Sequence, residues 1–167
     1  MTNLIKRQKV YDYLNQLGLA FSVTEHPAVF SIDDMKNLGI LFKGDVCKNL
    51  FLRDAAGKRH FLVTLPNDKV APLKILQTKL GTSRLGFASH ERLAKYLKLD
   101  QGEVTPFGLL DDEERRVELV LDAALVENLC LGVHPNDNTA TVWISFSDLH
   151  RAIEAHGNCI HIVALND

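Results

Sequence analysis

A lysine and an asparagine stand side by side in a segment that otherwise reads as a buried β-strand. Lys48 and Asn49 begin the run that continues through Leu50–Arg53, which is mostly apolar. A lysine is rarely buried without a partner, because removing an ammonium from water is costly. Lys48 therefore either reaches solvent from the strand end or meets a substrate phosphate or polarised oxygen. Asn49 either binds substrate or holds a neighbouring loop.

A second candidate site is the segment 132–138, which begins Gly-Val-His-Pro. Glycine allows a ligand to approach the backbone and proline fixes a loop, so free N–H groups near Gly132 could stabilise an oxyanion. His134 is the strongest functional candidate among seven histidines, and His26, which also precedes a proline, is the second. A hairpin turn over 135–138 explains these residues equally well.

Several catalytic templates are missing from the sequence. It contains no H-E-x-x-H, no G-x-S-x-G and no phosphate-binding P-loop. The three cysteines, Cys47, Cys130 and Cys159, lack C-x-x-C spacing, so we expect reduced thiols rather than disulfides or a zinc site. We see no signal peptide and no membrane-spanning stretch. The sequence therefore predicts a cytoplasmic protein with no metal, no cofactor and no membrane partner.

Charge is distributed unevenly along a chain whose net charge is −2. Residues 36–98 hold 13 Lys/Arg and 4 Asp/Glu, whereas residues 117–167 hold 1 and 7. Such polarity is expected when one face meets a polyanion, although a chance cluster of solvated lysines explains it as well. The basic stretch has few aromatic residues, which favours phosphate contacts over base stacking.

Helical and strand patterns alternate along the 167 residues, a length that fits one domain with a full core. Local signals predict helices over 2–17, 31–39, 72–80, 89–97 and 145–156, and strands over 19–23, 46–53, 59–65, 117–121, 139–144 and 160–164. The segments 46–53 and 59–65 are expected to form a hairpin around Gly57. The predicted fold class is α/β: a single-domain mixed β-sheet with helices packed around it.

Five segments in order resemble one known family. They are Cys47–Asp54, Arg84–Ser89, Val104–Leu109, Val120–Asp122 and His134–Asn138. On these motifs the chain resembles the YbaK/prolyl-tRNA synthetase-associated editing domain family over nearly its whole length. It is most similar to the freestanding prolyl-tRNA deacylases of the ProX and ProXp-ala type. The resemblance implies a YbaK-like fold and one aminoacyl-tRNA editing domain over residues 1–167.

The resemblance also implies an activity, namely trans-editing hydrolysis of mischarged alanyl-tRNA(Pro). Such an ester is already activated, so a positioned water suffices and no strong nucleophile is needed. The implied residues are catalytic Lys48, substrate-binding Asn49, Gly132 and His134, apolar wall residues Val29 and Phe30, and RNA-binding Arg53 and Arg84. The implied partner is the acceptor end of tRNA(Pro), with prolyl-tRNA synthetase or an elongation factor as further candidates. A cysteinyl-tRNA(Pro) deacylase and a non-catalytic tRNA- or synthetase-binding module remain the alternatives.

Overall fold

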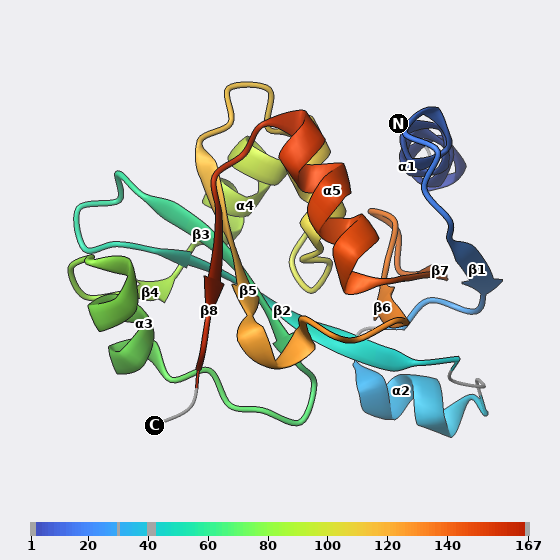
Figure 1. Cartoon of the computed structure of the whole chain (residues 1–167), viewed down its shortest axis with the longest axis horizontal. Coiled ribbons are helices and arrows are strands. Elements are labelled where there is room, and N and C mark those ends of the chain that lie inside the picture. The colour runs from blue at the N-terminus through green and yellow to red at the C-terminus, as the bar shows by residue number, and fades with distance from the viewer. Residues whose placement is uncertain (1–2, 30, 40–42, 166–167) are drawn as a thin grey trace.

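A mixed β-sheet runs through the centre of the molecule in a computed structural model of the chain (Figure 1). The structure describes residues 3–29, 31–39 and 43–165. The strands are β1 Ser22–Glu25, β2 Asp45–Arg53, β3 His60–Pro66, β4 Gly86–Phe87, β5 Val117–Asp122, β6 Leu131–Val133, β7 Ala140–Ile144 and β8 Ile160–Val163. Their order is β1-β7-β6-β2-β3-β5-β8, and β4 pairs with β2 beside this path. The predicted α/β fold class is confirmed.

Strand β2 joins the two halves of this sheet. It pairs antiparallel with β3 from Cys47 to Arg53, which confirms the predicted hairpin. Its other edge is shared: β6 pairs with its first two residues, Asp45 and Val46, and β4 pairs with its last two. Among the described residues, no strand pairs with that edge between Cys47 and Leu50. The sheet is therefore open in the middle of its longest strand, at the position of Lys48 and Asn49.

Helices cover both faces of the sheet. They are α1 Asn3–Gln16, α2 Ile32–Asn37, α3 Leu73–Leu80, α4 His90–Leu97 and α5 Phe146–His156, with the 3-10 helices η1 Pro106–Asp111 and η2 Ala123–Leu125. Helices α4, α5 and η1 pack on one face of β3 and β5, and α3 packs on the other (Figure 1). Helix α2 lies near the Asp45 end of β2, and α1 lies beside β1 (Figure 1). No helix in the described part of the chain is both long and apolar enough to cross a membrane.

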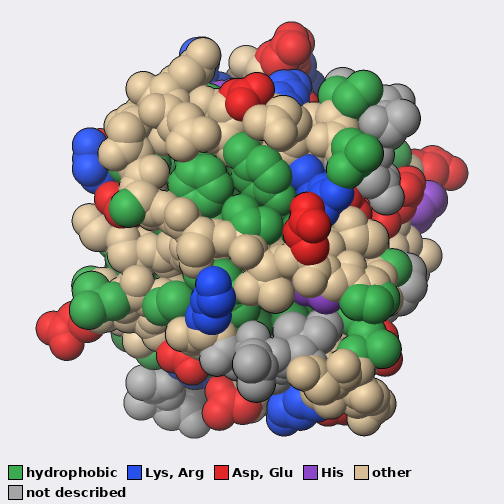
Figure 2. Space-filling model, turned by 90° about the vertical axis from the view of Figure 1, so that its right-hand side faces the viewer, with side chains coloured by type: hydrophobic (Ala, Val, Ile, Leu, Met, Phe, Trp, Pro, Cys, Tyr) green, Lys and Arg blue, Asp and Glu red, His purple; other side chains and the backbone are tan. Residues whose placement is uncertain are grey.

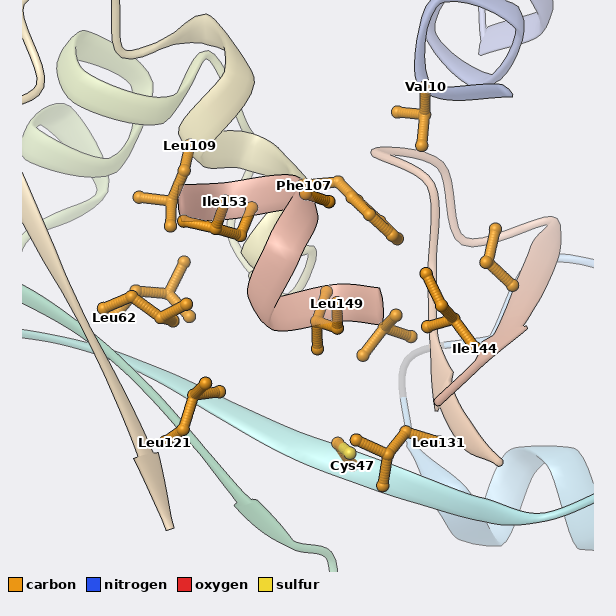
Figure 3. Close-up of a cluster of buried hydrophobic side chains, with 14 of the residues drawn as sticks. Val10, Cys47, Leu62, Phe107, Leu109, Leu121, Leu131, Ile144, Leu149 and Ile153 are labelled. Atoms are coloured by element: carbon orange, nitrogen blue, oxygen red, sulfur yellow. The ribbon is translucent and has the colours of Figure 1, made fainter. Parts of the chain in front are cut away.

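The larger core lies between α5 and the sheet. Leu149 and Ile153 of α5 face Leu62, Leu121 and Leu131 of the strands (Figure 3). Residues that alternate with these, such as Phe61 and Val63, belong to a second buried cluster under α3. Both faces of the central strands are thus buried, so a register shift of one residue would exchange the two sets of side chains. This packing fixes β2 and the residues on it.

Serines begin three of the helices as the sequence predicts. The hydroxyls of Ser31, Ser89 and Ser145 accept hydrogen bonds at 3.1–3.2 Å from the backbone N–H three residues later. Each such cap is worth about 1 kcal/mol. Gly81 and Gly157 end α3 and α5 with φ angles of 62° and 105°, which glycine adopts without strain.

Two predicted segments differ from the structure. The strand predicted over 19–23 begins only at Ser22, because Leu19 still closes α1 through a hydrogen bond from its N–H to the Leu14 carbonyl. The segment predicted as a turn after residue 131 starts as strand β6, which lies between β2 and β7. Thr2, the expected cap of the first helix, lies outside the described residues.

Candidate active site

A cavity of about 360 Å³ lies against the open edge of β2. Small-molecule sites typically measure roughly 300–1,000 Å³, so this one is small. Five predicted site residues line it: Val29, Lys48, Asn49, Gly132 and His134. The sixth, Phe30, lies outside the described residues. The structure therefore brings together segments that are more than 100 residues apart in the sequence.

Lys48 carries the uncompensated positive charge of this cavity. Its Nζ donates a hydrogen bond of 3.0 Å to the carbonyl of Lys69, and no carboxylate in the described ranges lies within ion-pair distance. Lys69 is neutralised by Asp122, whose Oδ2 is 2.7 Å from its Nζ. An ammonium has three donors, so Lys48 keeps two for a ligand. Its surroundings suit an anionic or polarised oxygen.

Asn49 lies next to Lys48 and also lines the cavity. Its Oδ1 accepts a 2.6 Å hydrogen bond from the hydroxyl of the buried Thr64, which lies opposite on β3. This contact orients the amide, and the described residues include no acceptor for its NH₂ group. Asn49 therefore both secures the hairpin and offers donors to the cavity.

Gly132 lines the cavity and is closely packed by its neighbours. A Cβ at this position would lie 2.7 Å from the Trp143 ring and 3.1 Å from a Val46 methyl. The backbone of Gly132 is paired with β2 on one side and β7 on the other. Gly132 therefore lies within the sheet, and the N–H groups expected near it for an oxyanion stay a prediction. Glycine is needed at this position for close packing.

His134 is half-buried at the cavity wall, just beyond β6, and both of its ring nitrogens are shielded from solvent. Burial lowers the pKa of its imidazole to about 4, although the charge of Asp137 and the backbone of Val104 and Glu103 partly oppose this effect. Neither ring nitrogen makes a well-aligned hydrogen bond in the described ranges, although the backbone of Val104 and Glu103 is close enough to favour the protonated ring. His134 is therefore neutral near pH 7 and shapes the cavity rather than supplying a proton.

Cys47 lines the same cavity but is not a nucleophile. Burial, assisted by the negative charge of Asp45, raises the pKa of its thiol to about 12. Only the thiolate attacks or binds metals. With Cys47 protonated and His134 neutral, these two residues cannot form the thiolate–imidazolium pair of a cysteine hydrolase.

Three polar residues of the cavity were not assigned to the site from the sequence. Asn138 and Thr141 line it, as does His26, which ranked second among the histidines. The Nδ1 of His26 lies 2.9 Å from the Pro27 carbonyl and its Nε2 lies 2.9 Å from the Thr141 hydroxyl. Both ring nitrogens of His26 therefore have a hydrogen-bond partner. His26 and Thr141 thus satisfy one another, whereas the Nδ2 of Asn138 has no partner in the described chain.

The two predicted RNA-binding arginines do not line this cavity. Arg53 lies five residues beyond Lys48 on β2, a separation of about 17 Å at the usual rise of a strand. Arg84 is exposed and precedes β4, whose Gly86 pairs with Arg53. On the side of the molecule that carries α1, β1 and α2, positive and negative side chains are interspersed around hydrophobic ones (Figure 2). That face carries no uniform basic patch.

Comparison with known proteins gives a consistent family. Residues 26–152 match the model of the aminoacyl-tRNA editing domain. A protein of Acetoanaerobium sticklandii named prolyl-tRNA editing protein ProX is 45% identical over 159 residues, which cover 95% of this chain and 97% of that one. Prolyl-tRNA synthetase associated domain-containing protein 1 of Danio rerio is 36% identical, with 89% and 81% covered. Its counterpart in Mus musculus is 35% identical, with 91% and 92% covered.

Two solved structures share the fold. A crystal structure described as a candidate trans-editing enzyme for prolyl tRNA synthetase superposes with a TM-score of 0.71 at 18% identity, covering 97% of each chain. The structure of the hypothetical protein APE2540 also gives a TM-score of 0.71, at 20% identity, with 93% of this chain and 98% of that one covered. At such identities the likeness concerns the fold alone.

Proposed function

The chain belongs to the aminoacyl-tRNA editing domain family, and from this premise we propose that it hydrolyses the ester bond of mischarged alanyl-tRNA(Pro) in trans. The observation that carries the proposal is the cavity at the open edge of β2, where Lys48 is charged and uncompensated. The relative named prolyl-tRNA editing protein, at 45% identity over almost the whole chain, supports tRNA(Pro) as the substrate class.

The chemistry that fits this cavity is attack by a positioned water. Cys47 is protonated and His134 is neutral, so neither supports covalent catalysis or acid catalysis near pH 7. An aminoacyl ester needs only orientation and stabilisation of the developing oxyanion. Lys48 anchors the phosphate of the terminal adenosine or the ester oxygen, and Asn49 donates to the same end of the substrate. The 2′-hydroxyl of the ribose orients the water.

Selection of alanine over proline rests on the size of the cavity. A synthetase pocket rejects a smaller amino acid weakly, because one methylene is worth only about 1–3 kcal/mol. A second and smaller pocket corrects this error by excluding the larger amino acid. Apolar side chains that line the cavity supply its walls: Val29, Met35, Val46, Val133 and Ala140. Together with His134 they confine the methyl group of alanine.

We further propose that the acceptor end of tRNA(Pro) extends from the cavity along β2 toward Arg53 and Arg84. Both arginines lie at the far end of the strand that carries Lys48. Recognition of exposed RNA ends and backbone is the usual route to specificity for RNA. The editing unit spans residues 1–167 in this proposal, because Arg7 of α1 is ion-paired with Asp137 beside the cavity.

Deacylation of three matched substrates tests the function. The purified chain is incubated with alanyl-, cysteinyl- and prolyl-tRNA(Pro), and release of each amino acid is followed over time. We expect release of alanine, with prolyl-tRNA(Pro) left intact. Faster release of cysteine would overturn the alanine assignment. Salt-sensitive binding of tRNA without release of any amino acid would overturn the deacylase proposal and identify a binding module instead.

A further inference from the structure

The loop between β6 and β7 contains, at the cavity, a hydrogen-bond donor without an acceptor among the described residues. Asn138 is only 8% exposed, lines the cavity, and its Nδ2 has no acceptor among the residues described. Buried amide groups are almost always hydrogen-bonded. The same group of its neighbour Asn136 has a partner, because the Nδ2 of Asn136 donates to the Phe107 carbonyl at 3.2 Å.

Contacts on both sides hold the backbone of Asn138 in place. Its carbonyl accepts a 3.2 Å hydrogen bond from the N–H of Val29. The preceding Asp137 accepts from the N–H and the hydroxyl of Thr139 at 3.0 and 2.8 Å. Asp137 also lies 3.1 Å from the Nε of Arg7, in an ion pair whose side chains are 0% and 10% exposed. The orphan donor is therefore part of a rigid loop and not of a mobile one.

Arg7 reaches this loop from outside the region that the family model matches. It lies on α1, whereas the matched region begins at residue 26. Its Nη1 also lies 3.3 Å from Glu25, so one guanidinium connects the helix, strand β1 and the loop. A planar guanidinium with several donors suits such a fixed junction.

We propose that Asn138 is a substrate-binding residue whose Nδ2 donates to the carbonyl oxygen of the aminoacyl ester, and that Arg7 is a positioning residue that acts through Asp137. The inference rests on the proposed function. In the reaction, a water oxygen bonds to the carbonyl carbon, and the π electrons move to the oxygen that Asn138 holds. The tetrahedral adduct then collapses: the carbonyl re-forms and the bond between the carbonyl carbon and the ribose oxygen breaks. The proton lost by the water passes to the ribose oxygen, which leaves as a hydroxyl. The developing oxyanion is stabilised by a fixed donor of this kind.

Two substitutions at residue 138 test the contact. Asn138→Asp keeps the size and the acceptor but loses the donor, and Asn138→Ala removes both. We expect each to lower kcat for alanyl-tRNA(Pro) by about 100-fold, as for loss of an oxyanion donor. Affinity for a non-hydrolysable amide, 3′-deoxy-3′-(L-alanylamino)adenosine, should change much less. A wild-type rate in Asn138→Asp overturns the inference, whereas an inactive wild-type protein overturns the proposed function.

Asn136→Asp serves as the matched control in the same loop. Asn136 does not line the cavity, so this variant should lower the melting temperature while the folded protein keeps its rate. If Asn136→Asp slows the reaction as much as Asn138→Asp does, the integrity of the loop sets the rate and the contact to Asn138 is refuted.

A double-mutant cycle tests the role of Arg7. Arg7→Met should lower kcat by about 10-fold in the wild-type background and have no further effect in Asn138→Asp, since coupled residues are not additive. Arg7→Lys should recover part of the rate, and it replaces Arg7→Met if that variant does not fold. Equal losses in both backgrounds would show that Arg7 acts independently of Asn138.

Discussion

Two histidines with shielded rings lie near the two ends of β2, and they differ in their hydrogen bonding. Burial lowers the pKa of each imidazole to about 4. His60, opposite Arg53, stacks against Tyr96 and Phe51 with centroids 4.2 and 5.7 Å away, and its Nε2 lies 3.0 Å from the guanidinium of Arg92. His134 has no aligned partner for either nitrogen in the described chain. The same lowering of the imidazole pKa thus accompanies different hydrogen bonding.

The polar groups around the two histidines also differ in how fully they are hydrogen-bonded. Near His60, Asp54 accepts hydrogen bonds from two backbone N–H groups, and Arg59 binds Glu118 through two nitrogens. Near His134, the segment 134–138 contributes four of the seven buried side-chain atoms without a hydrogen-bond partner in the described ranges. A satisfied polar network stabilises a fold, whereas the unpaired atoms of His134 and Asn138, which line the cavity, are available to a ligand. We therefore propose that one end of β2 serves stability and the other serves binding.

Removal of the ammonium should have the largest effect at the binding end. Lys48→Met keeps most of the aliphatic chain and is expected to lower kcat/KM for alanyl-tRNA(Pro) by about 100-fold or more. The melting temperature should be nearly unchanged, because no ion pair is lost. Lys74→Met, which removes an exposed lysine of α3, is the matched control and should keep the wild-type rate. Equal rates for the two variants would contradict the assignment of Lys48.

Truncation at the other end should affect stability and not catalysis. His60→Ala removes a fully packed ring and a partner of Arg92, and is expected to lower the free energy of unfolding by about 3 kcal/mol. Urea denaturation measures the loss. The kcat/KM per folded molecule should be unchanged. A rate as low as that of Lys48→Met would show that the two ends of the strand are not separable.

Stability should fall in acid because both histidines are held neutral. Their folded pKa values of about 4 lie below the unfolded value of about 6.5. Between pH 4 and pH 6.5 the unfolded chain binds more protons than the folded protein does. The contribution of these two histidines to the free energy of unfolding is therefore constant above about pH 6.5 and declines as the pH falls toward 4. The decline should be shallower in His60→Phe than in the wild type. Parallel curves for the two proteins would rule out a neutral, buried His60.

Loss of the distal arginines should weaken RNA binding moderately. The double substitution Arg53→Ala/Arg84→Ala is expected to raise KM for alanyl-tRNA(Pro) by about 5-fold with kcat unchanged, and to reduce the salt dependence of binding by about two phosphate contacts. Titrations of tRNA(Pro) at several salt concentrations measure the slope. An unchanged slope would place the acceptor stem elsewhere on the surface.

The smallest effect is expected at Cys47, although it lines the cavity. Its thiol stays protonated, so Cys47→Ala should change kcat/KM by less than about 3-fold, within the range of a modest packing defect. Single-turnover kinetics with alanyl-tRNA(Pro) measure the change. Loss of activity in this variant would favour a thiol nucleophile over a positioned water.

Local signals predicted the elements that carry the site. Serine caps, the αL glycines and the alternation in β2 and β3 are encoded within a few residues, so the hairpin and all five α-helices could be located from the sequence. Lys48 was identified because a lysine is anomalous in an apolar strand. The fold class followed from the mixture of helices and hairpins, and its confirmation required only that these elements pack as one sheet.

Long-range pairing decided what the sequence could not reveal. Strand β6 has three residues and forms because β2 and β7 flank it, whereas the sequence Gly-Val-His-Pro, which includes its last two residues, looks like a turn. The role of Gly132 depends on Trp143, which is distant in sequence. Asn138 stands in an Asn-Asp-Asn run typical of turns, so only its burial and its missing partner distinguish it.

A crystal structure of the protein with 3′-deoxy-3′-(L-alanylamino)adenosine is the most direct test of the central claim. We expect the alanyl group in the cavity at the open edge of β2, with its carbonyl oxygen near Asn138 and its adenosine end near Lys48. The methyl group should contact the apolar wall. Binding of the analogue beside Arg53 and Arg84, with the cavity left empty, would contradict the account.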